Sequence, residues 1–220
     1  MVKLYHLIGV ALGVGVMMAS KPEAIAEPMV AKGTLKHLIK VGESGKRGYN
    51  SYNRGSTRCA KSNRANLAIS VMTLDQIAYY QSLPACHSSK LLAVGFYQDI
   101  NVRRCQRRLN LSGSTIYSPA IQDKCFALYL VGDKQPAISR WITTGKNQKM
   151  AGHYASAEFA GLESPLLGRG YHDGNGNNKA TVSAEKVMAA LQNARAIYVK
   201  KRAEGVGHDD AYAEALGVTQ

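Results

Sequence analysis

Residues 34–45 read Thr-Leu-Lys-His-Leu-Ile-Lys-Val-Gly-Glu-Ser-Gly, and this stretch decides how the rest of the chain is interpreted. Its apolar residues follow the i, i+3, i+4 spacing of a helix face: Leu35, Leu38 and Ile39. Two glycines then mark the end of that helix. Glu43 therefore lies where a short helix gives way to residues 45–66, which are rich in Gly, Ser, Asn and Arg and predict turns and short strands.

The remainder of the chain predicts further helices. Thr73 with Gln76 has the form of a capping box, Ser118-Pro119 opens another helix, and Ser183 precedes the longest one. The expected helices cover about 73–82, 99–109, 119–131, 136–144, 150–162 and 183–203. This pattern predicts an α+β, mainly α fold, in which a small β or irregular lobe is inserted after the first helix. One domain over residues 27–220 is expected, with a helical extension at about 204–220 and a cleft beside the lobe.

The charge of the chain indicates an acidic partner. The 220 residues hold 28 Lys+Arg and 15 Asp+Glu, a formal charge of +13. The first residues narrow the choice: a charged start, an apolar run at 7–19 and an Ala-x-Ala ending at Ala26 predict a secretory signal over residues 1–26, with an uncleaved anchor as the alternative. Its removal takes two lysines and one glutamate and leaves +12. We expect an exported protein, periplasmic or extracellular, whose partner is an anionic envelope surface and not nucleic acid.

Four cysteines follow the signal, and an even number in an exported chain predicts disulfides. Cys105 and Cys125 lie in two helical runs joined by a turn-rich segment, so an antiparallel hairpin would bring them together. That pairing leaves Cys59 with Cys86, although four cysteines allow three connectivities. No close Cys/His spacing supports a zinc site. We expect no cofactor and no metal.

Glu43 is the leading candidate for chemistry. A carboxyl held against an apolar helix has its neutral form favoured, and such a group can protonate a departing sugar oxygen. The sequence also contains groups typical of a carbohydrate cleft. Tyr49 and Tyr97 supply flat faces and hydroxyls, and Asn50 and Gln98 supply amides that both donate and accept hydrogen bonds.

These motifs together resemble the lysozyme superfamily, whose lytic transglycosylases carry a Glu-Ser pair and a Gly-x-x-Gln turn. Within it the chain is most similar to the phage lambda type of endolysin. The similarity covers residues 34–203 and rests on ordered motifs: Glu43-Ser44, Gly48-Tyr49-Asn50, Gly95-Phe96-Tyr97-Gln98, Leu109-Asn110-Leu111, Ser118-Pro119-Ala120-Ile121-Gln122-Asp123 and Ala127-Leu128. The resemblance implies that Glu43 is the general acid. Ser44 is expected among the substrate-binding residues, where it would support Glu43 by a hydrogen bond; the alternative is that it caps local backbone.

The expected mechanism depends on whether a second carboxylate exists. Hydrolysing glycosidases use a pair, but the place where lambda-type enzymes carry an acid is here Asn50. Asp75 is better explained as a first-turn residue favoured by a helix dipole. Asp99 is expected in the same role for the next helix, although its position beside Gln98 keeps it a candidate. A single carboxyl fits a lytic transglycosylase, which cuts the MurNAc-GlcNAc β-1,4 bond of peptidoglycan glycan strands and leaves a 1,6-anhydro product.

The glycine- and asparagine-rich stretch 168–179 is the other dense feature. Asp173, Asn175 and Asn177 alternate like calcium ligands, but the glycine and glutamate that such a loop requires are absent. A loop lining the cleft, with Tyr171 against sugar, is expected. Two alternatives stay open: a hydrolysing muramidase, and a non-catalytic wall-binding or secretion-assembly protein belonging to an envelope complex.

Overall fold

The computed structural model describes residues 33–53, 67–175 and 178–218. It is mainly helical, with 57% helix, 8% strand and small antiparallel sheets, in agreement with the expected α+β, mainly α class. The expected signal at 1–26 and Cys59 lie outside the described residues, and the polar stretch 45–66 is described as far as Asn53. No helix in the described part is both long and apolar enough to cross a bilayer.

The first helix, α1 (Leu35–Ile39), begins at Thr34, whose side-chain oxygen accepts a hydrogen bond from the His37 N–H at 3.2 Å. The chain then widens into a π-helical turn at Lys40–Ser44 and tightens into a 3₁₀ segment at Gly45–Asn50. Gly48 has φ 51° and ψ −125° inside that segment, a conformation that a residue with a Cβ rarely adopts. The α-helix therefore gives way to a π-helical turn and then to a 3₁₀ segment around Glu43. Gly42 and Gly45 indicated that the helix would end here.

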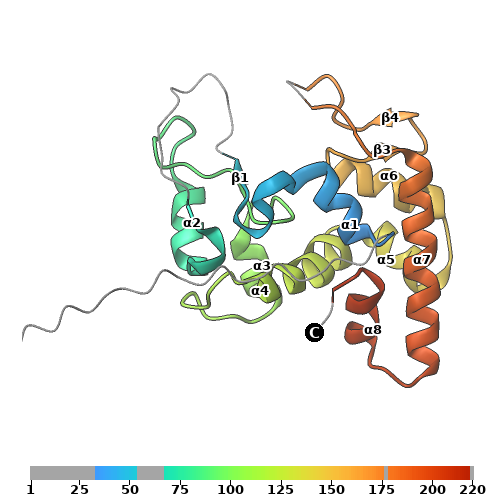
Figure 1. Ribbon diagram of the computed structural model, residues 1–220. Coiled ribbons are helices and arrows are strands. Elements are labelled where there is room, and N and C mark those ends of the chain that lie inside the picture. The colour runs from blue at the N-terminus through green and yellow to red at the C-terminus, as the bar shows by residue number, and fades with distance from the viewer. Residues whose placement is uncertain (1–32, 54–66, 176–177, 219–220) are drawn as a thin grey trace, which may run out of the picture.

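A small antiparallel sheet joins the lobe to the helices. Strand β1 (Tyr52–Asn53) pairs with β2 (Ala93–Val94), with Tyr52 opposite Val94. Between them lie a 3₁₀ turn (Ile69–Val71) and α2 (Leu74–Ser82), which has the expected capping box of Thr73 and Gln76. Figure 1 shows α2 and β1 on one side of α1 and the α5 to α7 helices on the other.

The remaining helices build the body of the molecule. They are α3 (Val102–Arg108), α4 (Pro119–Lys124) with its π-helical continuation η4 (Cys125–Asp133), α5 (Pro136–Thr144), α6 (Gln148–Glu158), α7 (Ala184–Ala203) and α8 (His208–Ala215). A hairpin of β3 (Glu163–Ser164) and β4 (Arg169–Gly170) precedes α7. The helix expected at 150–162 ends at Glu158 because Phe159 takes an extended conformation, which starts the turn toward Gly161.

Cys105 and Cys125 form a disulfide between α3 and η4, which confirms the pairing expected for these two residues. The C-terminal segment is part of the same core: Ala211, Tyr212 and Leu216 are buried, and the Leu216 carbonyl accepts a hydrogen bond from the Lys36 N–H at 3.3 Å. The hydrophobic core runs continuously from α1 to Val218. The start of α1 is thus held by the last residues of the described chain.

Candidate active site

Glu43 is positioned by a contact between two glycines. Gly42, in the wide turn after α1, lies against Gly161, which follows α6. A Cβ placed on Gly161 would lie 2.5 Å from the Cα of Gly42, closer than real Cβ contacts come. The two backbones can approach this closely only because neither residue has a side chain. The approach brings Glu43 against the segment between α6 and β3.

The Glu43 carboxyl has the setting of a general acid. It is half-buried, and its Oε1 accepts a hydrogen bond from the Gly161 N–H at 2.6 Å. Burial raises the pKa of Glu43 above the usual range, and the Gly161 hydrogen bond and the nearby His172 partly oppose that rise in pKa. A carboxyl with these surroundings holds its proton to higher pH than an exposed one and still has a donor ready for the charged form.

The loop after β4, which contains Tyr171 and His172, lies near this carboxyl, and His172 acts on the pKa of Glu43. Tyr171 follows β4, is 49% exposed, and has its ring between those of His153 and His172, at centroid distances of 5.5 and 5.1 Å. The Tyr171 N–H donates to Oγ of Ser156 at 2.9 Å, and Nε2 of His172 donates to the Ala157 carbonyl at 2.9 Å. Both residues of the loop are therefore fixed to α6. An exposed ring that is held in place is suited to stacking on a sugar face.

Asp173 fixes the next part of the same loop. Its two carboxylate oxygens accept hydrogen bonds from the N–H groups of Gly170 (2.9 Å) and Ala180 (2.7 Å), and these bonds lower the pKa of Asp173. Its carboxylate thus ties the loop together. Asn177 of the calcium-like pattern lies outside the described residues. Within the described ranges, no group of three metal-ligating side chains is found.

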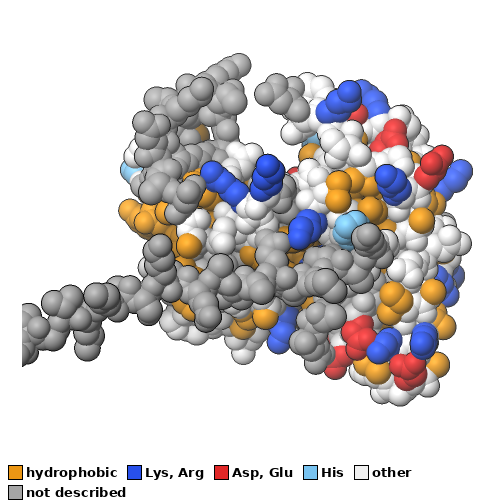
Figure 2. All heavy atoms as spheres, in the orientation of Figure 1, with side chains coloured by type: hydrophobic (Ala, Val, Ile, Leu, Met, Phe, Trp, Pro, Cys, Tyr) orange, Lys and Arg blue, Asp and Glu red, His pale blue; other side chains and the backbone are white. Residues whose placement is uncertain are grey.

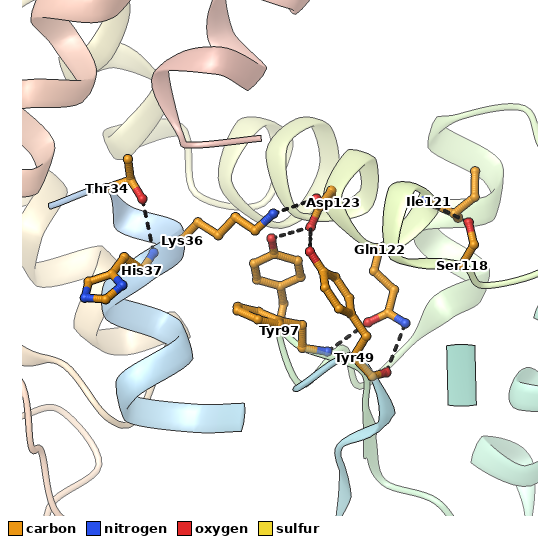
Figure 3. Close-up of polar contacts among 10 residues, drawn as sticks. Thr34, Lys36, His37, Tyr49, Tyr97, Ser118, Ile121, Gln122 and Asp123 are labelled. Atoms are coloured by element: carbon orange, nitrogen blue, oxygen red, sulfur yellow. Dashed lines mark hydrogen bonds and ion pairs between the residues drawn. The ribbon is translucent and has the colours of Figure 1, made fainter. Parts of the chain in front are cut away.

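The two tyrosines expected to bind substrate lie in the core. Tyr49 and Tyr97 are each 3% exposed, and both hydroxyls donate to Oδ1 of Asp123, at 2.9 and 2.6 Å. Burial and the neighbouring Asp123 raise the pKa of Tyr97 well above its usual range. Figure 3 shows both rings pointing toward Asp123. These side chains present neither a ring face nor a hydroxyl to a ligand at the surface.

The side-chain amides of Asn50 and Gln98, which were expected to bind substrate, form hydrogen bonds with backbone groups instead. Oδ1 of Asn50 accepts a hydrogen bond from the Ser70 N–H at 2.9 Å. Nε2 of Gln98 donates to the Gly95 carbonyl at 2.9 Å, which closes a tight turn in which Gln98 itself has φ 53°. Both amides are half-buried and stabilise the lobe and its turn. The side chain of Ser44 is not among those described.

No site role was expected for three residues at the centre of this arrangement, although two of them, Gln122 and Asp123, belong to the motif at 118–123. Lys36 is 1% exposed, and its Nζ lies 2.7 Å from Oδ2 of Asp123. Gln122 accepts the Phe96 N–H at 2.8 Å and donates to the carbonyls of Tyr49 and Tyr117. The Gly-Tyr-Asn, Gly-Phe-Tyr-Gln and Gln-Asp motifs therefore meet in one buried network (Figure 3). The one sequence signal that could have indicated the buried ion pair is the position of Lys36 among the apolar residues of the first helix.

The two candidates for a second carboxylate do not contact Glu43. Asp75 is exposed in the first turn of α2, as expected, and pairs with Arg103. Asp99 does not have the expected place in a helix first turn, because α3 begins at Val102. It is 1% exposed; Oδ1 accepts the Asn101 N–H at 2.8 Å, and Oδ2 has no hydrogen-bond partner. Among the described residues, the charged side chain that shifts the pKa of Glu43 is His172 and not a carboxylate.

Comparison of the chain with protein-family models, curated proteins and solved structures finds no match.

Proposed function

We propose that the protein is an exported peptidoglycan-cleaving enzyme of the lysozyme superfamily, a lytic transglycosylase with Glu43 as its acid and base. The observation that carries the proposal is the half-buried Glu43 carboxyl, with its raised pKa, near a loop in which His172 acts on that pKa and the adjoining Tyr171 presents an exposed ring. A carboxylic acid whose pKa is raised can donate its proton to a glycosidic oxygen, and an exposed aromatic ring can stack on a sugar face.

The reaction uses one carboxyl twice. Glu43 donates its proton to the glycosidic oxygen as the carbon–oxygen bond breaks, and the leaving sugar departs as an alcohol. The Gly161 N–H, 2.6 Å from Oε1, stabilises the carboxylate that remains. The carboxylate then accepts the proton of the muramic acid 6-hydroxyl, whose oxygen closes the 1,6-anhydro ring. Glu43 ends protonated, and no water is consumed.

The charge and the disulfide fit this setting. Figure 2 shows Lys and Arg side chains over α1 and near β4 on the face that it presents. Such charges attract an anionic wall polymer, with an interaction that weakens as salt rises. The Cys105–Cys125 disulfide is typical of proteins outside the reducing cytoplasm.

Digestion of purified sacculi tests the proposal. We expect the chain without residues 1–26 to release muropeptides with 1,6-anhydro ends, and Glu43→Gln to release none. Glu185→Gln, which removes an exposed carboxyl in the first turn of α7, is the matched control and should keep full activity.

The products separate the proposal from its alternatives. Reducing ends in place of anhydro ends would identify a hydrolysing muramidase and would require a second carboxylate. Binding of sacculi without release of any fragment, unchanged in Glu43→Gln, would identify a wall-binding protein with no catalytic step.

A further inference from the structure

A basic cavity lies beside the N-terminal part of α6. It has a volume of about 370 Å³ and is formed by the start of α5, the turn between α5 and α6, and the first part of α6. Its lining contains three cations and no acid: Lys134, Arg140 and Lys146. Met150 and Tyr154, which are both exposed, complete the wall.

The cations of the cavity are only partly neutralised. Lys134 pairs with Oε1 of Glu158, and Gln135 donates to Oε2 of the same carboxylate at 2.7 Å, so both oxygens of Glu158 are engaged. Arg140 and Lys146 are exposed, and neither side chain has a carboxylate partner within the described parts of the chain. Two positive charges therefore remain available to a ligand.

Two helix ends add to this positive potential. The cavity is lined by Pro136 and Ala137, the first two residues of α5, and by Asn147, which directly precedes α6. Neither helix has an acidic residue in its first turn, and neither has a side chain that caps it. The N-terminal end of a helix carries a partial positive charge and favours anions. Two cationic side chains and two such ends on one cavity form a site for a carboxylate or phosphate.

A row of rings joins this cavity to the candidate active site. Tyr154, in the cavity wall, is followed by His153 at a centroid distance of 5.6 Å, and His153 by Tyr171 at 5.5 Å. Tyr171 is followed by His172 at 5.1 Å, which acts on the pKa of Glu43. The cavity is therefore a continuation of the surface on which the glycan would lie.

We propose that this cavity binds a carboxylate of the acidic peptide attached to the glycan strand, and that the protein consequently prefers peptide-bearing glycan to bare glycan. The inference rests on the proposed function and names its substrate class. Arg140 suits the carboxylate because its planar guanidinium can donate two parallel hydrogen bonds, and Lys146 adds a point charge.

Binding to a catalytically blocked chain tests this without relying on catalysis. In the Glu43→Gln background, soluble peptide-bearing glycan strands are compared by calorimetry with the same strands after an amidase has removed the peptides. Arg140→Gln with Lys146→Gln should weaken binding of the peptide-bearing strands about tenfold and leave binding of bare strands unchanged. Arg104→Gln with Arg107→Gln, the same change of charge on exposed residues of α3, is the matched control.

The outcomes are distinct. Equal affinity for both kinds of strand, or an equal loss in the α3 control, overturns the inference. The same holds if inorganic phosphate, at matched ionic strength, binds the cavity while peptide-bearing strands do not bind there. Cavity-dependent binding together with an inactive unmodified chain would support the inference and contradict the proposed cleavage instead.

Discussion

The backbone N–H of Gly161 donates a 2.6 Å hydrogen bond to Oε1 of Glu43, across a sequence separation of 118 residues. The same glycine lies against Gly42, so one residue sets both the position of the Glu43 turn and the hydrogen bond to its carboxylate. The position of the Glu43 carboxyl thus depends on the segment after α6 as much as on α1, and the Gly161 hydrogen bond limits how far burial raises its pKa.

Gly161→Ala is expected to reduce both stability and activity. The new Cβ would lie 2.5 Å from the Gly42 Cα, so the two backbones must separate. Overpacking of this kind costs about 1–3 kcal/mol, and a shift of the carboxyl by about 1 Å can lower the rate about 100-fold. Urea denaturation and release of muropeptides measure the two effects. Gly207→Ala, where a Cβ meets only ordinary contact, should retain activity; an active Gly161→Ala would contradict this account.

His172→Gln is expected to move the pH profile of activity. The positive form of His172 lowers the pKa of Glu43, so its removal raises the pKa of Glu43 further. Because Glu43 acts first as an acid, activity is lost as the pH rises through the pKa of Glu43. The loss of activity should therefore occur at higher pH in the variant. A profile of the rate against pH measures this, and a shift to lower pH would contradict it.

The helices could be predicted from the sequence because their signals are local. The capping box of Thr73 and the Ser118-Pro119 start need only adjacent residues, and the disulfide of Cys105 followed from a turn between two helices. Contacts between segments that are distant in the sequence could not be predicted in this way. Lys36 is buried because Asp123, 87 residues away, neutralises it, and no local pattern contains that pair.

Long-range contacts also explain why some of the expected site residues are buried and others are exposed. Tyr49 and Tyr171 directly follow a glycine and Tyr97 lies two residues after one, so the three are similar as sequence features. Tyr49 and Tyr97 lie in the core, where Asp123 accepts both hydroxyls, whereas Tyr171 lies in the loop after β4, which is held by α6. An aromatic residue beside a glycine indicates a turn; its exposure depends on partners that are distant in the sequence.

Removal of Lys36 should cost more stability than removal of the whole charge pair. Lys36→Met leaves the Asp123 carboxylate buried without its cation, a loss of about 3–5 kcal/mol. Lys36→Met with Asp123→Asn keeps an oxygen for the tyrosine hydroxyls without a buried charge, and should be more stable than Lys36→Met alone.

Urea denaturation of the single and double variants measures this coupling. The exposed pair of Arg103 and Asp75 is the control, and Arg103→Met should cost less than about 1 kcal/mol. A double variant less stable than Lys36→Met would contradict the role assigned to the buried charge.

Asp99 should make stability fall between about pH 4 and pH 6. Burial raises the pKa of Asp99 from 3.8 to about 6, against the hydrogen bond from Asn101 and the nearby Lys134, which lower its pKa. The folded state therefore binds this proton more tightly than the unfolded state does. The stabilisation is fully present below the unfolded pKa and is lost as the pH rises through the folded pKa. The difference in pKa corresponds to about 3 kcal/mol.

Asp99→Asn isolates this contribution, because the amide keeps an oxygen for the Asn101 N–H and cannot ionise. We expect the variant and the parent chain to have similar unfolding free energies near pH 3.5, and the variant to be more stable by about 3 kcal/mol at pH 7.5.

Urea denaturation at a series of pH values gives the difference in unfolding free energy between the two chains, in which the contributions of carboxyl groups common to both cancel. Asp75→Asn, which alters an exposed carboxyl, should show a much smaller change of that difference with pH. A constant difference between Asp99→Asn and the parent across this range would mean that the pKa of Asp99 is the same in the folded and the unfolded protein, so that folding does not disfavour its charge. The carboxylate would then need a partner for Oδ2, the atom that has none in the structure.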